Sequence, residues 1–324
     1  MTGLSAMGVM PSYYDLPVCW ISSSAERDAY RSAELVGTFT EAYHPRVGST
    51  NLRLEGDTIM KNRRISGFVL FLTPMLLVPA LLCAQSPFDG TWHTKLEQSK
   101  LSPKPIVFST QNAMYDCSSC SPKIHVKADG QDQPVSGQPY DTISVREVDS
   151  KSLEITAKKG GKAEFEQTRT VSDDGNTLTV KTTSHPKNSD QVVTGEATLS
   201  RIGKAPAGAN GTSGSWRIGK INQSENGRTT TYKSNGDELS MSTPTGESYT
   251  AKLDGKEYAV KGAYGYDSVS LKRVDDRTIE ETDKRDGKTV TVTKITVSPD
   301  GKKMTSVLTS TLTGRTSTYV AEKQ

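Results

Sequence analysis

The sequence predicts an all-β protein built from two tandem small antiparallel barrels. Residues 140–183 match residues 266–309 without a gap, at an offset of 126 and with 17 identities in 44 positions. Segments rich in Val, Thr and Tyr alternate with Asn-Gly and Asp-Gly pairs, which are typical of β-hairpins. Only 33% of the chain is hydrophobic, and that composition favours two thin cores over one large core. An internal repeat of this length indicates one structural unit used twice.

The repeat extends beyond this block in both directions. A Gly-x-Trp motif at 90–92 answers a second one at 214–216. Each unit therefore begins near such a motif and is a little over a hundred residues long, which is a normal size for a small domain. We expect one barrel over residues 86–203 and the other over residues 214–324. Residues 204–213, rich in Ala and Gly, have the composition of a linker.

About eight or nine strands are expected in each copy, which indicates an up-and-down barrel or a sandwich. Helix is nearly absent, apart from a predicted turn near residues 96–101. Alternation defines the buried face in several strands. The pairs that should share a face are Leu153 with Ile155, Leu178 with Val180, and Val269 with Leu271.

The apolar phase slips within residues 289–297, where Val290 and Val292 are followed by Ile295 and Val297. One extra residue, a β-bulge near Thr293, would restore the buried face. The first copy instead keeps Ala163, Phe165 and Val171 in a single phase, so the repeat departs from symmetry there.

The first 85 residues contain a targeting signal. A basic stretch at 60–64 precedes an apolar run at 65–83, as in a secretory signal peptide that begins at Met60 and is cleaved after Ala84 or Gln85. Residues 1–59 are then a start-site artefact or a disordered extension. The alternative is a membrane anchor through residues 65–83, a run nearly long enough to span a bilayer.

Charge argues against nucleic acid as a partner. The formal net charge is only +3 over 324 residues, and lysines are interleaved with acids, whereas phosphate binding needs clustered Lys and Arg. We also expect contact with a membrane only through the signal or anchor segment.

The Gly-x-Trp openings resemble those of the lipocalin and calycin group of small barrels; the residues are Gly90, Trp92, Gly214 and Trp216. The Phe-Asp-Gly-Thr-Trp stretch at 88–92 also resembles the opening of a family of uncharacterised exported bacterial proteins. This resemblance spans most of residues 86–324 and implies a lipocalin-like fold, but it implies no particular activity, cofactor or ligand.

Cys117 and Cys120 are the two cysteines that remain after cleavage of the predicted signal. A close pair in an exported chain indicates a structural disulfide. One alternative is a thiol redox centre, which requires a thiolate activated at a helix N-terminus. The others are a metal site with His125, for which a fourth ligand is missing, and a reduced pair.

Other polar residues have simpler structural explanations. His93, His125 and His185 lie in no nucleophile or metal-binding motif, so a hydrolytic triad is not favoured. Asp149, Asp275 and Asp276 could act as acid and base, but turn residues of this type usually bond their own backbone. We predict no catalytic residue, metal site or cofactor.

Trp92 and Trp216 are more typical of a buried barrel end than of ligand contacts, and Tyr140 and Tyr266, present in both copies, are predicted to be structural. The sequence therefore predicts an exported protein, periplasmic or secreted, that is not an enzyme and that binds a small apolar ligand. The alternative is a structural or protein-interaction module of the cell envelope whose partner is an envelope protein. Any specific activity is expected where the copies differ, in residues 117–125 and around Phe165.

Overall fold

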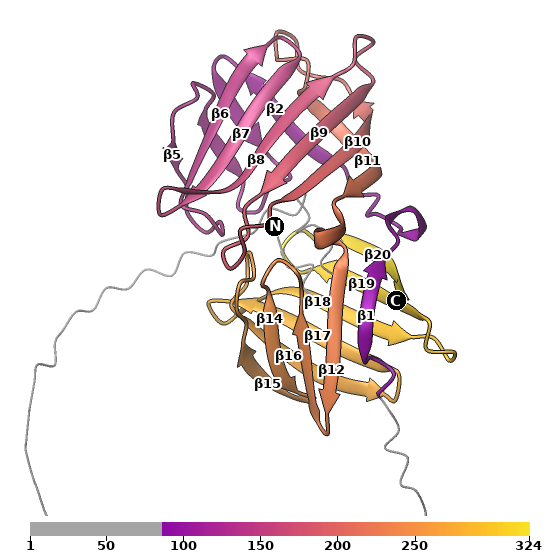
Figure 1. The fold of residues 1–324 in the computed structure, drawn as a ribbon. Coiled ribbons are helices and arrows are strands. Elements are labelled where there is room, and N and C mark those ends of the chain that lie inside the picture. The colour runs from indigo at the N-terminus through magenta and orange to yellow at the C-terminus, as the bar shows by residue number, and fades with distance from the viewer. Residues whose placement is uncertain (1–85) are drawn as a thin grey trace, which may run out of the picture. The chain divides into compact units, whose positions relative to one another are not determined.

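The computed structural model describes residues 86–324, and within them the chain forms two ten-stranded antiparallel sheets that are each nearly closed into a barrel (Figure 1). The predicted all-β class is confirmed. Two short 3₁₀ turns, η1 (Leu96–Gln98) and η2 (Glu225–Gly227), are the helical elements of this part of the chain. The signal or anchor segment and residues 1–59 lie outside the described residues. No helix among the described residues is long and apolar enough to cross a membrane.

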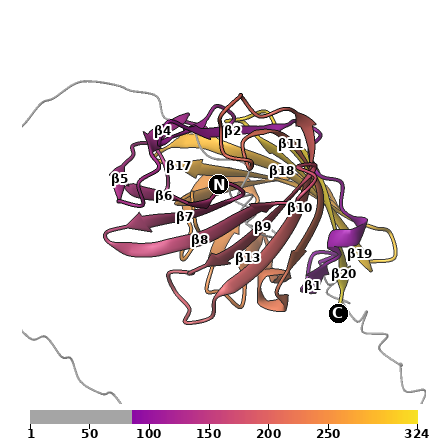
Figure 2. The same ribbon diagram turned by 90° about the horizontal axis from the view of Figure 1, so that it is seen from above.

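The first barrel consists of consecutive strands in the order β4-β3-β2-β11-β10-β9-β8-β7-β6-β5. Figure 2 shows these strands curving round from β5 through β10 to β2 and β4. The strands are β2 (Ile106–Gln111), β3 (Met114–Cys117), β4 (Ile124–Lys127), β5 (Gln133–Pro134), β6 (Thr142–Asp149), β7 (Ser152–Lys159), β8 (Lys162–Val171), β9 (Thr177–Ser184), β10 (Val193–Gly203) and β11 (Gly214–Gln223).

The second barrel has the order β14-β13-β12-β1-β20-β19-β18-β17-β16-β15. Its strands are β1 (Gly90–Thr94), β12 (Thr229–Asn235), β13 (Glu238–Ser242), β14 (Ser248–Lys252), β15 (Asp254–Ala259), β16 (Ser268–Asp275), β17 (Thr278–Arg285), β18 (Lys288–Val297), β19 (Lys303–Ser310) and β20 (Thr316–Lys323). Strands β6 to β9 and β16 to β19 have bounds that differ by the 126 residues of the sequence repeat.

The two Gly-x-Trp strands are exchanged between the repeats. β1 pairs with β12 and β20 of the second barrel, whereas β11 pairs with β10 and β2 of the first barrel. In Figure 1 the indigo β1 lies between the orange β12 and the yellow β20. The boundaries expected from the repeat therefore do not coincide with the sheets. The first barrel comprises residues 106–223, and the second takes β1 from one end of the described chain and β12 to β20 from the other.

The two connections beside the exchanged strands are ordered. Between β1 and β2, Lys100 bridges to Thr318, and Arg315 donates to the carbonyl oxygens of Lys104 and Pro105, both at 2.6 Å. Residues 204–213 are not a free linker, because Thr212 and Ser213 at their end are fully buried. The linker composition predicted exposure, but these side chains pack into the first barrel.

The expected alternation is confirmed, since all six residues of the pairs named above are at most 3% exposed. A β-bulge does occur in β18, but the extra residue is Val290, between Thr289 and Thr291, rather than a residue near Thr293. The first copy has the same bulge at Glu164. The predicted asymmetry around Phe165 is therefore wrong: a single phase in the sequence concealed a bulge whose extra residue is a buried glutamate.

Candidate functional site

The two tryptophans are buried in the cores of the two barrels, Trp216 in the first and Trp92 in the second. Trp92 and Trp216 are at most 1% exposed, and their indole N–H groups donate to carbonyl oxygens four residues earlier, at 2.8 and 2.9 Å. A cation covers each ring: Lys323 lies 5.4 Å from the centroid of Trp92, and Arg201 lies 4.1 Å from that of Trp216. These contacts support the predicted structural role.

The backbone conformation requires glycine at the first position of each Gly-x-Trp motif. Gly90 and Gly214 have φ values of +124° and +129°, which side chains rarely adopt. A Cβ at Gly214 would lie 2.8 Å from the carbonyl oxygen of Gly203. The Gly-x-Trp motif is therefore explained by backbone geometry and burial, without a ligand.

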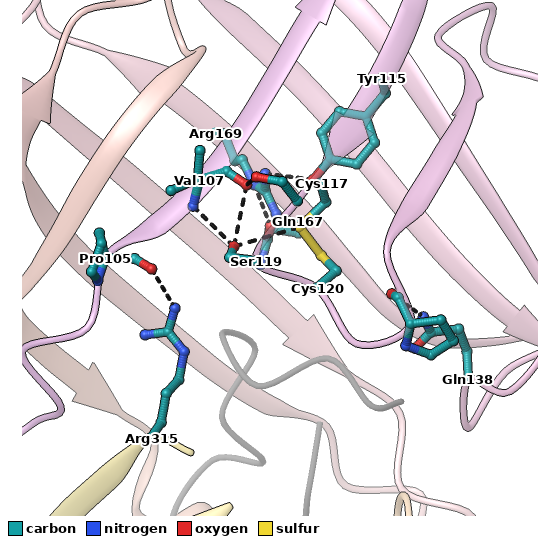
Figure 3. The surroundings of a disulfide bond; sticks show 12 residues. Pro105, Val107, Tyr115, Cys117, Ser119, Cys120, Gln138, Gln167, Arg169 and Arg315 are labelled. Carbon is teal, nitrogen blue, oxygen red and sulfur yellow. Dashed lines mark hydrogen bonds between the residues drawn. A yellow bond between two sulfur atoms is a disulfide. The ribbon is translucent and has the colours of Figure 1, made fainter. Parts of the chain in front are cut away.

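Cys117 and Cys120 form a disulfide in the turn that follows β3, with their Cα atoms 5.3 Å apart. The two residues are 3% and 7% exposed. Ser119 belongs to the same turn, and its hydroxyl accepts from the backbone N–H of Val107 at 2.9 Å (Figure 3). The pair lies in a β-hairpin rather than at a helix N-terminus, and its sulfurs are buried, so the geometry favours a structural disulfide over a redox centre.

The three histidines among the described residues lie on β1, on β4 and just after β9. His125 Nδ1 is 2.5 Å from Asp116 Oδ1 on an exposed part of β3 and β4, and His93 lies 3.3 Å from Glu225. His185 follows β9 and pairs through its backbone with Glu164. Residues 86–324 contain no group of three His, Cys, Asp or Glu side chains placed to hold a metal ion.

The carboxylates at the hairpins accept hydrogen bonds from the backbone of their own turns, as expected. Asp149 accepts from the backbone N–H of Lys151 at 2.7 Å, and Asp275 accepts from that of Arg277 at 2.8 Å. These bonds stabilise the tight turns that connect neighbouring strands.

The interior of the first barrel contains a basic network that the sequence did not reveal. Arg169 on β8 is 7% exposed; its Nε donates to Gln167 Oε1 at 2.6 Å and its Nη1 to the Tyr115 hydroxyl at 3.0 Å. The guanidinium carbon lies 4.3 Å from the ring centroid of Phe108. Figure 3 shows Tyr115, Gln167 and Arg169 in the surroundings of the disulfide. Arg169 is separated from Phe165 and Val171 by even numbers of residues, so the three side chains share one face of β8. This spacing was the sign in the sequence that Arg169 is buried.

The interior of the second barrel is acidic instead. Glu281 and Asp283, both on β17, are fully buried, and the Tyr249 hydroxyl donates to Glu281 Oε2 at 2.5 Å. Tyr266 donates to Glu247, and burial raises the pKa of Glu247 to about 8. Burial also raises the pKa of Tyr249 and of Tyr266, so both hydroxyls stay protonated at neutral pH.

Tyr140 and Tyr266, which occupy equivalent positions of the two copies, have different surroundings. Tyr140 is 2% exposed and packs edge-on against Phe165, with ring centroids 5.9 Å apart. Its hydroxyl has no hydrogen-bond partner, whereas the Tyr266 hydroxyl bonds to Glu247. Both side chains are buried, but of the two only Tyr140 leaves its hydroxyl without a partner. Their structural role stays a prediction.

Space is distributed unevenly between the inside and the outside of the first barrel. The internal cavity beside Tyr140 and Arg169 has a volume of about 10 Å³. On the outer face, strands β7 to β11 form an open depression of about 830 Å³. Hydroxyl and charged side chains surround it, among them Glu154, Thr156, Glu166, Thr168, Lys181, Thr183, Thr194 and Glu196.

No family model, curated protein sequence or solved structure matches this chain. The lipocalin-like resemblance therefore stays a prediction, and functional inference depends on the geometry of the two barrels.

Proposed function

We propose that this chain is a non-enzymatic interaction module of the cell envelope, with the outer face of the first barrel as its contact surface. The observation that supports this proposal is the contrast between an inner cavity of about 10 Å³ and an outer depression of about 830 Å³. Ligand-carrying sites usually provide about 300 Å³ or more of enclosed space. The cavity beside Tyr140 is far below that size.

The alternative of a small apolar ligand has less support. Large side chains fill the barrel interiors, including Phe108, Tyr115 and Trp216 in the first and Tyr232 and Met241 in the second. Buried Arg169, Glu281 and Asp283 also make these interiors poor solvents for an apolar molecule.

The chemistry of the depression suits a polar partner. Its outward side chains alternate between threonine and charge, as in the register pairs of Glu166 with Thr183 and of Thr168 with Lys181. Three glutamates and one lysine among these side chains favour a hydroxyl-rich or basic partner segment. The proposed partner is an envelope protein that presents such a segment.

Export is part of the proposal and depends on residues 60–85. The Cys117–Cys120 disulfide supports it, because structural disulfides persist mainly in oxidising compartments. N-terminal sequencing of the mature protein tests it: a first residue at or near Ser86 is expected, and a chain that retains residues 1–59 would contradict cleavage.

Site-specific photocrosslinking tests the contact surface. A photoreactive residue at Thr168, inside the depression, should give a discrete crosslinked product in intact envelopes. Lys294 is the matched control, because it lies on β18 at the repeat position equivalent to Thr168 and is exposed. Equal crosslinking from both positions would contradict the proposal. Native mass spectrometry is the second arm, because a retained apolar molecule would favour the ligand-carrier alternative.

A further inference from the structure

The second barrel carries a polar groove over strands β12 to β15, with a volume of about 640 Å³. Lys233 and Thr250 in its lining are exposed, whereas their neighbours Tyr232 and Tyr249 are buried, so the groove lies on the outer face of the barrel. Two lysines and five serine or threonine residues line it, and none of its lining residues is acidic. Its size is within the range of roughly 300–1,000 Å³ that is typical of ligand-binding clefts.

The two lysines of this groove have no charge partner within residues 86–324. None of the salt bridges among these residues involves Lys233 or Lys261. The nearby Glu257 on β15 lies 2.7 Å from Lys284 instead. The groove is therefore positively charged, and its charge is complementary to that of an acidic partner.

The groove also contains main-chain groups that no neighbouring strand pairs. β14 and β15 are the two edges of the sheet, and they meet at a bridge where Ser248 and Lys261 exchange two hydrogen bonds of 2.9 Å. Alternate residues of a strand direct their N–H and C=O groups to the same side, so those of Thr250 and Ala259 face the gap beside this bridge. Both residues line the groove. Unpaired groups at a sheet edge are a template for an added peptide segment.

The corresponding edge of the first barrel is blocked. The strand registers place three residues of the first barrel at the positions of these groove residues: Ser109 at that of Lys233, Pro134 at that of Ala259, and Ser136 at that of Lys261. Proline has no N–H to donate and is typical of protected sheet edges. The edge strand β5 is also only two residues long. An open, basic edge therefore distinguishes the second barrel from the first.

We propose that this groove binds an acidic segment of a partner protein in extended conformation. The main chain of the segment bonds to the free groups of Thr250 and Ala259, and its carboxylates pair with Lys233 and Lys261. A peptide fits this edge better than other acidic ligands, because its main chain offers both donors and acceptors. The site is independent of the contact surface proposed on the first barrel.

Fluorescence anisotropy of labelled peptides with the purified full chain tests this proposal. The probe is a peptide of four Thr-Glu repeats, and a peptide of four Thr-Gln repeats is the neutral control. The acidic peptide should bind about tenfold more tightly, the combined effect of two exposed ion pairs. Its affinity should fall as sodium chloride screens the lysines. Unlabelled polyglucuronate, an acidic chain without peptide groups, should compete poorly.

Variants that introduce the residues of the first barrel separate charge from main-chain pairing. Lys233→Ser and Lys261→Ser should each weaken binding of the acidic peptide about two- to fivefold. Ala259→Pro removes one main-chain donor and no charge, and it should weaken binding about two- to tenfold. Lys294→Ser, at an exposed lysine of β18, is the matched control and should leave binding unchanged. If Ala259→Pro does not fold, a peptide of four Pro-Glu repeats makes the same test from the peptide side, and it should bind more weakly than the Thr-Glu peptide.

Four outcomes would overturn the proposal. The first is equal affinity for the acidic and the neutral peptide. The second is unchanged binding when both Lys233 and Lys261 are replaced by serine. The third is a Pro-Glu peptide or polyglucuronate that binds as tightly as the Thr-Glu peptide, which would indicate charge without main-chain pairing. The fourth is a chain that does not bind the peptide but self-associates through these lysines, since the occupant would then be a second copy.

Discussion

The two barrels have the same strands and opposite interiors. Across the aligned strands, Ile155, Ala157 and Arg169 of the first barrel correspond to Glu281, Asp283 and Ile295 of the second. The strand bounds and the bulge are preserved, so neither fold nor register depends on these positions. The comparison teaches that the same barrel accommodates interior charge of either sign.

Separating the barrels should produce the largest effect. A fragment of residues 106–223 contains all ten strands of the first barrel and should fold alone, with a β-sheet circular dichroism spectrum and cooperative unfolding. A fragment of residues 229–324 lacks β1, which lies between β12 and β20, and should not fold.

The control for this experiment is the second fragment preceded by residues 86–105, which should restore folding. Independent folding of residues 229–324 would show that the exchanged strand is dispensable.

Removal of either tryptophan should cost about 3–5 kcal/mol of unfolding free energy, because each is a large, fully buried core side chain. Trp92→Ala should destabilise the second barrel and Trp216→Ala the first, although the sequence repeat assigns them the other way round. Hydrogen exchange measured for each barrel checks this assignment. Loss of protection in β2 to β10 on mutation of Trp92 would argue against the exchange of strands.

The second barrel should lose stability as pH rises between about 4.5 and 8. Glu247 has a folded pKa of about 8, above its usual value of 4.5, so the folded state holds a proton that the unfolded state releases. Its contribution is complete below pH 4.5 and is lost through pH 8, with a slope of about 1.4 kcal/mol per pH unit at most.

Glu247→Gln should flatten this slope, as measured by denaturant unfolding of the second barrel at pH 5, 6 and 7. The first barrel should keep its own pH dependence in the variant, because burial raises the pKa of Glu164 there. An unchanged slope in the variant would assign the pH dependence to other groups.

Replacing both Cys117 and Cys120 with alanine should lower the stability of the first barrel by about 2 kcal/mol, the chain-entropy contribution of so short a loop. The second barrel, which lacks the pair, should be unaffected. Urea unfolding monitored by hydrogen exchange separates the two barrels. A larger loss in the second barrel would indicate coupling through the exchanged strands.

Much of the local structure was predictable from the sequence. The Asp-Gly pairs predicted turns, and Gly175 and Gly301 both adopt φ near +70°. Two-residue periodicity identified the buried positions of the strands, because successive side chains of a strand point to opposite faces. The cysteine pair was equally clear from its spacing.

The buried network around Arg169 was not predictable to the same degree. Arg169 lies in phase with buried Phe165 and Val171, but a charged residue in a threonine-rich strand is usually exposed. The bulge at Glu164 could not be recognised in the sequence either. Its extra residue is polar, so the pattern of apolar residues does not show where the strand changes phase. Only the three-dimensional arrangement showed that Tyr115, Tyr140 and Arg169 line one cavity.

By itself, the sequence determined the repeated unit, its turns, its strand faces and its disulfide, because these depend on neighbours a few residues away. The tertiary structure alone decided which barrel receives each Gly-x-Trp strand. Both motifs read Gly-x-Trp, and pairing between residues more than a hundred positions apart leaves no local signal. Contacts such as those of Arg315 with Lys104 and Pro105, which hold the β1–β2 connection along β20, become visible only in the folded chain.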